Sequence, residues 1–216
     1  MSDLRLTRAI NNPVRGTNDD QWMNMRGTRD GALFTASWFQ ALSLEGRVFA
    51  CGIGTLSDGE ALPAAVITTL RPMLWVRVPS GTTIMPVYAS LQLEAATGQL
   101  EAMVAIDQAD MGNGTSSAAD YGPLSLRTDA PVTSNCTCRQ EATGDVTAET
   151  NLAPVGRLYH DDSATNLVHS SLWEWKPPVA PVVVGPSTFA MYIGGSAAPT
   201  VTAQIIWAEV PSTDVV

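Results

Sequence analysis

The sequence predicts an all-β protein: a jelly-roll-like antiparallel β-sandwich with an extended N-terminal arm. Three observations support this prediction. Apolar and polar residues alternate over several long runs, Gly- and Pro-rich turns separate those runs, and we find no amphipathic helix of three or more turns. A length of 216 residues suits a single sandwich. We therefore divide the chain into an arm, residues 1–30, and a sandwich domain, residues 31–216.

The expected strands follow one another along the sandwich domain. Before the middle of the chain they are residues 32–44, 47–56, 64–70, 73–78, 82–94 and 99–107. After the middle they are residues 164–175, 177–185, 187–195 and 199–210, and the prolines of the 177–185 run suit an edge strand or a connector.

Two turns and one alternating pair make this prediction more specific. Asp58-Gly59 between apolar runs predicts a hairpin. Pro79-Ser80-Gly81 predicts a corner, or a bend where a strand passes between sheets. The runs 82–94 and 99–107 both alternate with period two, and we expect them to pair as a long hairpin. The residues expected to point inward are Val87, Ala89, Leu91, Leu93, Leu100, Ala102, Val104 and Ile106.

Residues 107–166 form a loop-rich insertion by composition, because Gly, Ser and Asp are dense there. A structureless loop of this length is unusual in a compact domain, so we expect either added strands or a protruding functional loop. Short candidate strands lie around residues 124–127 and 132–139.

The charge of the chain excludes some classes of partner. The net charge of −9 and the isoelectric point of about 4.5 argue against nucleic acid, whose phosphates need basic patches. No run approaches the length of an apolar membrane helix, and the N-terminus lacks the apolar segment of a secretory signal. We expect a chain made in the cytoplasm, with no membrane or nucleic-acid partner.

Candidate metal ligands are few. Three cysteines, Cys51, Cys136 and Cys138, do not make a secreted disulfide framework, and we expect reduced thiols, with Cys136 and Cys138 on one face of a strand. His160 in "YHDD" is read as a solvated turn, and the acids from Asp107 do not have calcium-loop spacing. We expect no metal and no cofactor.

The sequence carries no recognisable catalytic motif. It lacks the Gly-x-Ser-x-Gly elbow, the phosphate-binding loop and the dinucleotide fingerprint, and its two histidines, His160 and His169, do not supply a cupin metal set. We therefore read the chain as a non-enzyme. A carboxylate pair for glycoside hydrolysis stays open, because the separation of two carboxylates is a three-dimensional property.

The arm contains five arginines and four aspartates, so it is about +1 while the rest of the chain is about −10. Arginine pairs with carboxylates in a bidentate manner and is frequent at interfaces. We expect Arg15, Arg26 and Arg29 to pair with carboxylates of neighbouring subunits, with Trp22 as an apolar anchor.

Trp173 and Trp175 lie two apart in "SLWEW" and share one face of a strand. Exposed, they form a ligand platform for sugar rings or a partner. Buried, they are part of a core or an interface, which is the reading that we favour.

Two stretches, "LWVRVPSGTTIMPVYASLQLEAATG" and "FAMYIGGSAAPTVTAQIIWAEVP", resemble β-rich virion proteins of tailed bacteriophages that decorate heads or form spikes. The resemblance implies a non-enzymatic homo-oligomer, trimeric or pentameric, bound to the major capsid protein in a virion assembled in the host cytoplasm. The alternative is a carbohydrate- or receptor-binding sandwich at a tail or spike tip, using the tryptophan pair or the loop from Asp107 to Gly122.

Overall fold

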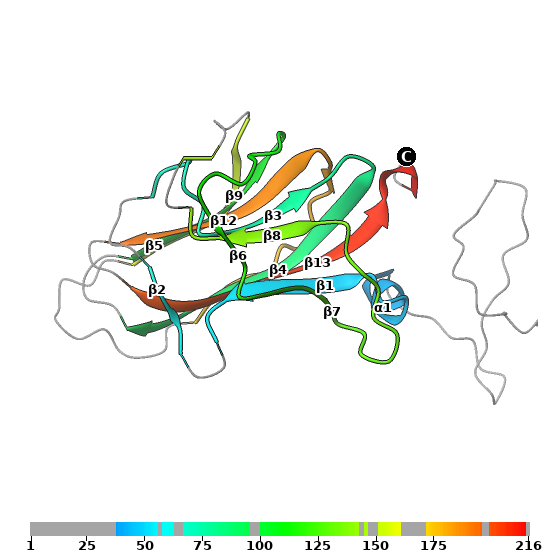
Figure 1. Ribbon diagram of the computed structural model, residues 1–216, viewed down its shortest axis with the longest axis horizontal. Coiled ribbons are helices and arrows are strands. Elements are labelled where there is room, and N and C mark those ends of the chain that lie inside the picture. Colours follow the sequence, from blue (N-terminus) through cyan, green and yellow to red (C-terminus); the bar gives the residue numbers. More distant parts are fainter. Residues whose placement is uncertain are drawn as a thin grey trace, which may run out of the picture.

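The computed structural model describes residues 38–55, 58–62, 67–95, 100–142, 145–146, 151–160, 172–195 and 199–214. In this part of the chain two antiparallel sheets face each other, and a single short α-helix lies at one end (Figure 1). The expected all-β sandwich is confirmed.

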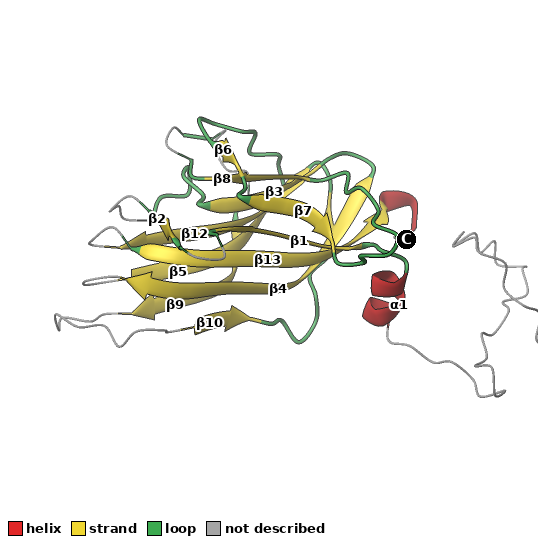
Figure 2. Cartoon of the chain, turned by 60° about the horizontal axis from the view of Figure 1, so that its bottom comes forward, coloured by secondary structure: helices red, strands yellow, loops and turns green. Residues whose placement is uncertain are grey.

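The first sheet, sheet I, contains seven strands. Their bounds are β1 Val48–Ile53, β2 Glu60–Ala61, β4 Thr82–Ala95, β7 Tyr121–Ser125, β10 Leu172–Trp175, β11 Val183–Val184 and β13 Thr200–Pro211. The strand order is β10-β4-β13-β1-β7, with β11 also beside β4 and β2 also beside β13. Figure 2 shows this sheet with the helix α1, Trp38–Leu44, at its end.

The second sheet, sheet II, contains six strands. Their bounds are β3 Leu74–Val78, β5 Leu100–Asp107, β6 Ser117–Ala118, β8 Thr137–Gln140, β9 Ala153–His160 and β12 Ser187–Gly195. Their order is β6-β8-β3-β12-β5-β9. A 3₁₀ helix, η1 Ser212–Asp214, follows β13.

The eight principal strands pair in a nested order. The first pairs with the last, β1 with β13, and the second with the second from last, β3 with β12. Inside them β4 pairs with β10, and β5 with β9. Successive pairs alternate between sheet I and sheet II, so the path of the chain is that of one long hairpin wrapped around the core.

The corner at Pro79–Gly81 is confirmed. It joins β3 in sheet II to β4 in sheet I, and the amide of Thr82 donates to the carbonyl of Pro79 at 3.2 Å. Gly81 has a φ of +83°, which glycine adopts without a Cβ penalty. The strand therefore changes sheets within three residues.

The main core lies between the sheets and follows the predicted alternation. Inward residues of β5 and β12 are buried there, including Val104, Phe189 and Met191. Trp207 of β13 stacks on Phe49 of β1 with ring centroids 6.0 Å apart. The period-two pattern thus identified the core face of these strands.

The run at residues 32–44 was predicted as a strand, and this is wrong for its described part, which is α1. Phe39 and Leu42, three apart, face the sheet, a helical spacing. Gly46, with a φ of +75°, ends the helix, and the amide of Arg47 donates to the carbonyl of Leu42 at 2.9 Å. This is a Schellman C-cap, so Glu45-Gly46 is a helix stop rather than a strand end.

Both predicted hairpins are wrong. β1 and β2, on either side of Asp58-Gly59, run along the same side of β13, so the chain loops out and resumes its strand. β4 and β5 lie in different sheets. Alternation marks the face of a strand but does not identify its neighbour, so a crossing between sheets and a hairpin produce the same pattern.

The segment 107–166 supplies strands to both sheets. β7 extends the edge of sheet I, while β6, β8 and β9 belong to sheet II. The candidate strands at 124–127 and 132–139 correspond to β7 and β8 with shifted bounds. Of the two expectations for this segment, added strands are present in its described residues.

Candidate interaction surface

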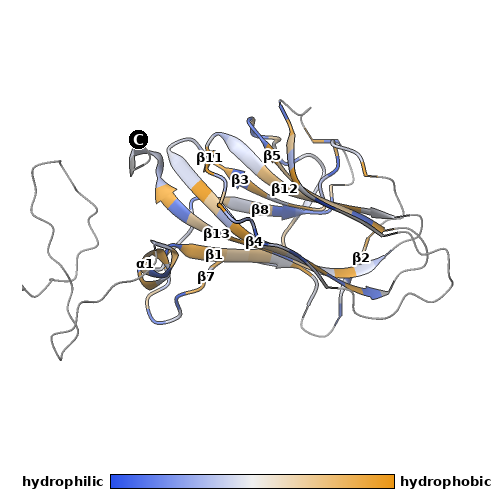
Figure 3. Cartoon of the chain, turned by 180° about the vertical axis from the view of Figure 1, so that it is seen from behind, coloured by the Kyte–Doolittle hydropathy of each residue, from blue (hydrophilic) through white to orange (hydrophobic). Residues whose placement is uncertain are grey.

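The helix α1 covers only one end of the outer face of sheet I. Leu42 is buried there against Val48, Ala208 and Val210 of the two central strands. Hydrophobic residues gather on α1 and on the strands beside it (Figure 3). Burial of Leu42 holds the helix against the sheet. Trp38, the first residue of the helix, therefore lies at the margin of the covered area.

A proline-rich segment forms the opposite margin. β10 and β11 both pair with β4, but residues 176–182 between them leave the sheet. Pro177, Pro178 and Pro181 have no amide hydrogen to contribute to a ladder, which favours this departure. The segment exposes 81% of Val179, while Val183 returns to the core.

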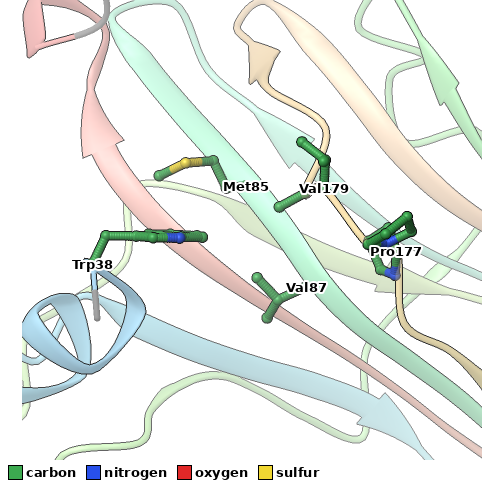
Figure 4. A pocket seen from close by; sticks show the side chains of 7 residues that line it. Trp38, Met85, Val87, Pro177 and Val179 are labelled. Atoms are coloured by element: carbon green, nitrogen blue, oxygen red, sulfur yellow. The ribbon is translucent and has the colours of Figure 1, made fainter. Parts of the chain in front are cut away.

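A groove of about 440 Å³ lies between these margins. The seven residues that line it are uncharged: Trp38, Met85, Val87, Pro177, Pro178, Val179 and Ala180. Met85 and Val87 rise from β4 as the floor, with Trp38 on one side and Val179 on the other (Figure 4). Trp38 is 48% exposed, so part of its ring faces solvent at the margin of the groove.

A β-bulge turns Val87 toward the groove. Ile206 pairs with Tyr88 and Trp207 with Pro86, so Val87 is the extra residue of β4. The sequence predicted that Val87 would point inward, and this is wrong. In a bulge two residues lie opposite one partner, which interrupts the alternation at Val87. Beyond the bulge, Ala89, Leu91 and Leu93 are buried as expected.

The rim beside the prolines carries a small charged network. Tyr88 Oη donates to Glu174 Oε1 and Lys176 Nζ to Glu174 Oε2, both at 2.9 Å. The ammonium of Lys176 also lies 5.1 Å from the centre of the Tyr88 ring. The hydrogen bond from Lys176, followed by that from Tyr88, lowers the pKa of Glu174. Glu174 therefore stays ionised at the mouth of the groove.

A second apolar area lies at the other end of α1. Leu44, Leu124 and Leu126 are each about half exposed there. Arg127 connects this area to the helix, because its Nη1 donates to the carbonyl of Leu44 at 2.5 Å. Exposed apolar residues are therefore present near both ends of α1.

Trp175 does not belong to an exposed platform. It is only 8% exposed, its Nε1 donates to the carbonyl of Val155 at 3.0 Å, and its ring lies 5.5 Å from that of Phe189. Trp173 is half-buried against the same core. The favoured core reading is confirmed for Trp175, and the platform is wrong because this strand turns its tryptophan face toward sheet II.

The loop from Asp107 is packed against sheet II. Asp107 is buried, and Asp110 forms a bidentate ion pair with Arg77. This hydrogen bonding holds the pKa of Asp110 below its usual range. Trp75 Nε1 donates to the carbonyl of Gly112 at 3.2 Å. Among the described residues, no group of three His, Cys, Asp or Glu side chains is placed to hold a metal ion.

The three cysteines are free and buried in the core between the sheets. Cys136 and Cys138 share the inward face of their segment, as predicted. Burial raises the pKa of both thiols. They are therefore protonated thiols that pack as small apolar groups.

Several predicted site residues lie outside the described residues: Arg15, Trp22, Arg26, Arg29, Asp161, Asp162 and His169. His160 ends β9, and its backbone alone is described. The groove itself was missed by the sequence analysis. Two local features of the sequence could have indicated the groove. They are the proline-rich run "PPVAP" and Trp38 in an uncharged stretch.

No family model, no curated protein and no solved structure matches this chain. Among the described helices, none has the length and apolar character needed to span a membrane.

Proposed function

We propose that this chain is a structural subunit of a virion, which self-associates and binds the major capsid protein as a decoration or head-spike component. The observation that carries the proposal is the open apolar groove beside α1. Contiguous exposed apolar surface of this kind marks sites of association in soluble proteins. Its tryptophan, methionine and paired prolines form a concave surface at which a partner side chain is removed from water.

The strand connectivity supports the same function. We infer from the nested pairing of eight strands, alternating between two sheets, that the sandwich is a jelly roll. Jelly rolls are a recurring architecture of viral capsid proteins. This connectivity agrees with the family that the two long stretches resemble, although fold by itself does not determine function.

The composition fits a protein that works in an assembly. Only 15% of the residues are charged, well below the roughly 25% of a typical soluble domain. A negative chain also avoids competing for nucleic acid during assembly around a packaged genome. The arginines of the arm then act as the cations available for carboxylates on neighbouring subunits.

The first test is the native mass of the purified chain, measured by light scattering on a sizing column. We expect a trimer or pentamer for the natural sequence, and dissociation when Val179→Asp places a charge in the groove. Ala118→Asp is the matched control, because it adds the same charge at an exposed position of sheet II. A monomeric natural chain, or equal effects of the two substitutions, would overturn the proposal.

The capsid partner needs a separate measurement. Purified capsids that lack this chain should bind it and sediment with it, and the Val179→Asp variant should sediment far less. If the natural chain stays in the supernatant, the capsid is not its partner.

A further inference from the structure

We propose that the groove of one copy receives residues 22–25, "WMNM", from the arm of a second copy. This inference rests on the proposed function, because it names the contact by which the copies associate. Arm exchange of this kind joins copies through the groove, so the two sandwiches need no further contact with each other.

The place where the arm joins the fold is the first argument. Thirty-seven residues precede Trp38, and Trp38 is itself a wall of the groove. Each copy in an assembly therefore carries a groove and, attached at its margin, thirty-seven residues of chain that are long enough to reach a neighbour's groove.

The composition of the arm is the second argument. Between residues 11 and 30 the sequence is mostly polar or charged, and Trp22, Met23 and Met25 are its concentrated apolar group. The groove that faces solvent is lined by apolar and aromatic side chains and has the volume of a small-ligand site. Methionine adapts to irregular apolar surfaces, and tryptophan buries a large area on a stiff side chain.

Charge complementarity is the third argument. Arg26 and Arg29 follow the apolar group directly, and Glu174 lies exposed at the rim with a lowered pKa. Lys176 already pairs with this carboxylate, with Nζ 2.9 Å from Oε2, so an arginine of the arm would join an existing ion pair. The remainder of the chain carries about −10, so an arm of about +1 is attracted to any neighbouring copy.

The reach of the arm allows a neighbour as the host. Residues 26–37 link the apolar group to Trp38, and an extended linker of this length spans roughly 40 Å. A domain the size of residues 38–216 has a radius of gyration of about 16 Å. The linker is therefore long enough to leave its own subunit and cross to the next one, and the trapping experiment below distinguishes this from docking in its own groove.

Disulfide trapping tests this contact. We would prepare Met23→Cys and Val179→Cys as separate full-length variants, mix them, oxidise them with diamide, and map the linked peptides by mass spectrometry. No single chain carries both new cysteines, so a linked 23–179 peptide forms only between copies. We expect at least ten-fold more of it than with Ala118→Cys in place of Val179→Cys.

Two results would overturn the inference. The first is no 23–179 peptide above the Ala118→Cys control. The second is that the peptide appears only in the Met23→Cys/Val179→Cys double variant, in a band of monomer mass, which would place the arm in its own groove. The natural cysteines are buried in the core, so they do not compete in the folded protein.

Light scattering on the same samples distinguishes a failure of arm exchange from a failure of self-association. An oligomer that yields no 23–179 peptide would refute arm exchange and leave self-association standing. A monomer at every concentration would refute self-association, and arm exchange with it.

Discussion

The two outer faces of the sandwich differ in how much of their apolar surface the chain itself covers. On sheet II, loops of the chain itself cover the strands and form a second core. That core contains Trp75, Met103, Met111, Ala142, Val146 and Tyr192, all buried. On sheet I, α1 covers one end of the face and leaves the groove beside it open, with Trp38 and Val179 exposed.

Polar contacts show how the covered face is completed. The hydroxyl of Tyr192 donates to the carbonyl of Thr69 at 3.0 Å, and Thr188 bonds the loop at Ala109 and Met111. These bonds fix the loops in one position over apolar side chains. The floor and the margins of the groove are apolar instead, so the surface that fits it best is another apolar surface. One face is thus covered by the chain itself, whereas the groove on the other face is open in the single subunit; under the proposed function a second copy covers it.

The largest expected effect compares one tryptophan from each face. Trp75→Ala removes a fully buried ring and should lower the free energy of unfolding by about 3–5 kcal/mol. Trp38→Ala removes a half-exposed ring and should cost about 1 kcal/mol or less in the isolated subunit. Urea unfolding at low protein concentration, followed by far-UV circular dichroism, measures both.

Light scattering on the same two variants completes this comparison. Trp38→Ala should weaken self-association more than it weakens the fold. Equal unfolding costs for the two substitutions would show that the groove wall belongs to the core of the subunit, and the contrast between the faces would be lost.

Much of the fold was predictable because side chains alternate strictly in an extended strand. The burial of Leu100, Val104 and Phe189 follows from that pattern alone. The identity of each neighbour does not, and so β4 and β5 were paired although they lie in different sheets. The corner at Pro79–Gly81 was predicted correctly because proline and glycine impose a local bend whichever strands lie beside them.

The groove was not predictable from local pattern. It joins residues near 38, 85 and 179, which come together only through the packing of α1 and the departure of the proline segment from β4. Its floor also depends on the bulge at Val87, which no alternation rule anticipates. The helix itself had a readable signal, the spacing of Phe39 and Leu42 before Gly46, which the β-rich context obscured.

An intermediate effect is expected at the ion pair that holds one covering loop on sheet II. Arg77→Gln removes the bidentate partner of Asp110, and partial exposure of the pair limits the loss to about 1 kcal/mol at pH 7. The pKa of Asp110 is lowered, mainly by the hydrogen bond from Arg77. The stabilisation is therefore present above the ordinary aspartate pKa and lost as the pH falls through the lowered value.

Thermal unfolding between pH 2 and 7 tests this dependence. The difference in melting temperature between Arg77→Gln and the natural chain should shrink below about pH 4. Asp110→Asn should produce a similar loss at pH 7, and the double variant should lose little more than either single change. A difference independent of pH would mean that Arg77 stabilises the loop through its packing and its hydrogen bond to Asn113 rather than through the charge of Asp110.

The smallest expected effect is a gain in stability at Glu141, whose side chain interacts with Glu60 of β2 in sheet I. Glu141 begins the loop after β8, where its amide donates to the carbonyl of Met73 at 2.9 Å. Burial, followed by the negative charge of Glu60, raises the pKa of Glu141 above its ordinary value of 4.5. Ionised Glu141 therefore destabilises the folded chain at neutral pH, and the penalty is absent below pH 4.5.

Glu141→Gln keeps the shape and removes the charge, so it should stabilise the chain at pH 7 by about 0.5 kcal/mol, given the partial exposure of the site. The gain should vanish near pH 4, where both forms are neutral, and denaturant midpoints at the two pH values measure it. Asp58→Asn, which removes an exposed carboxylate, is the control for general charge reduction. A gain that persists at pH 4 would show that the charge is not its cause. The confirmed pattern would mean that this loop keeps its place over sheet II through its apolar contacts despite the charge of Glu141.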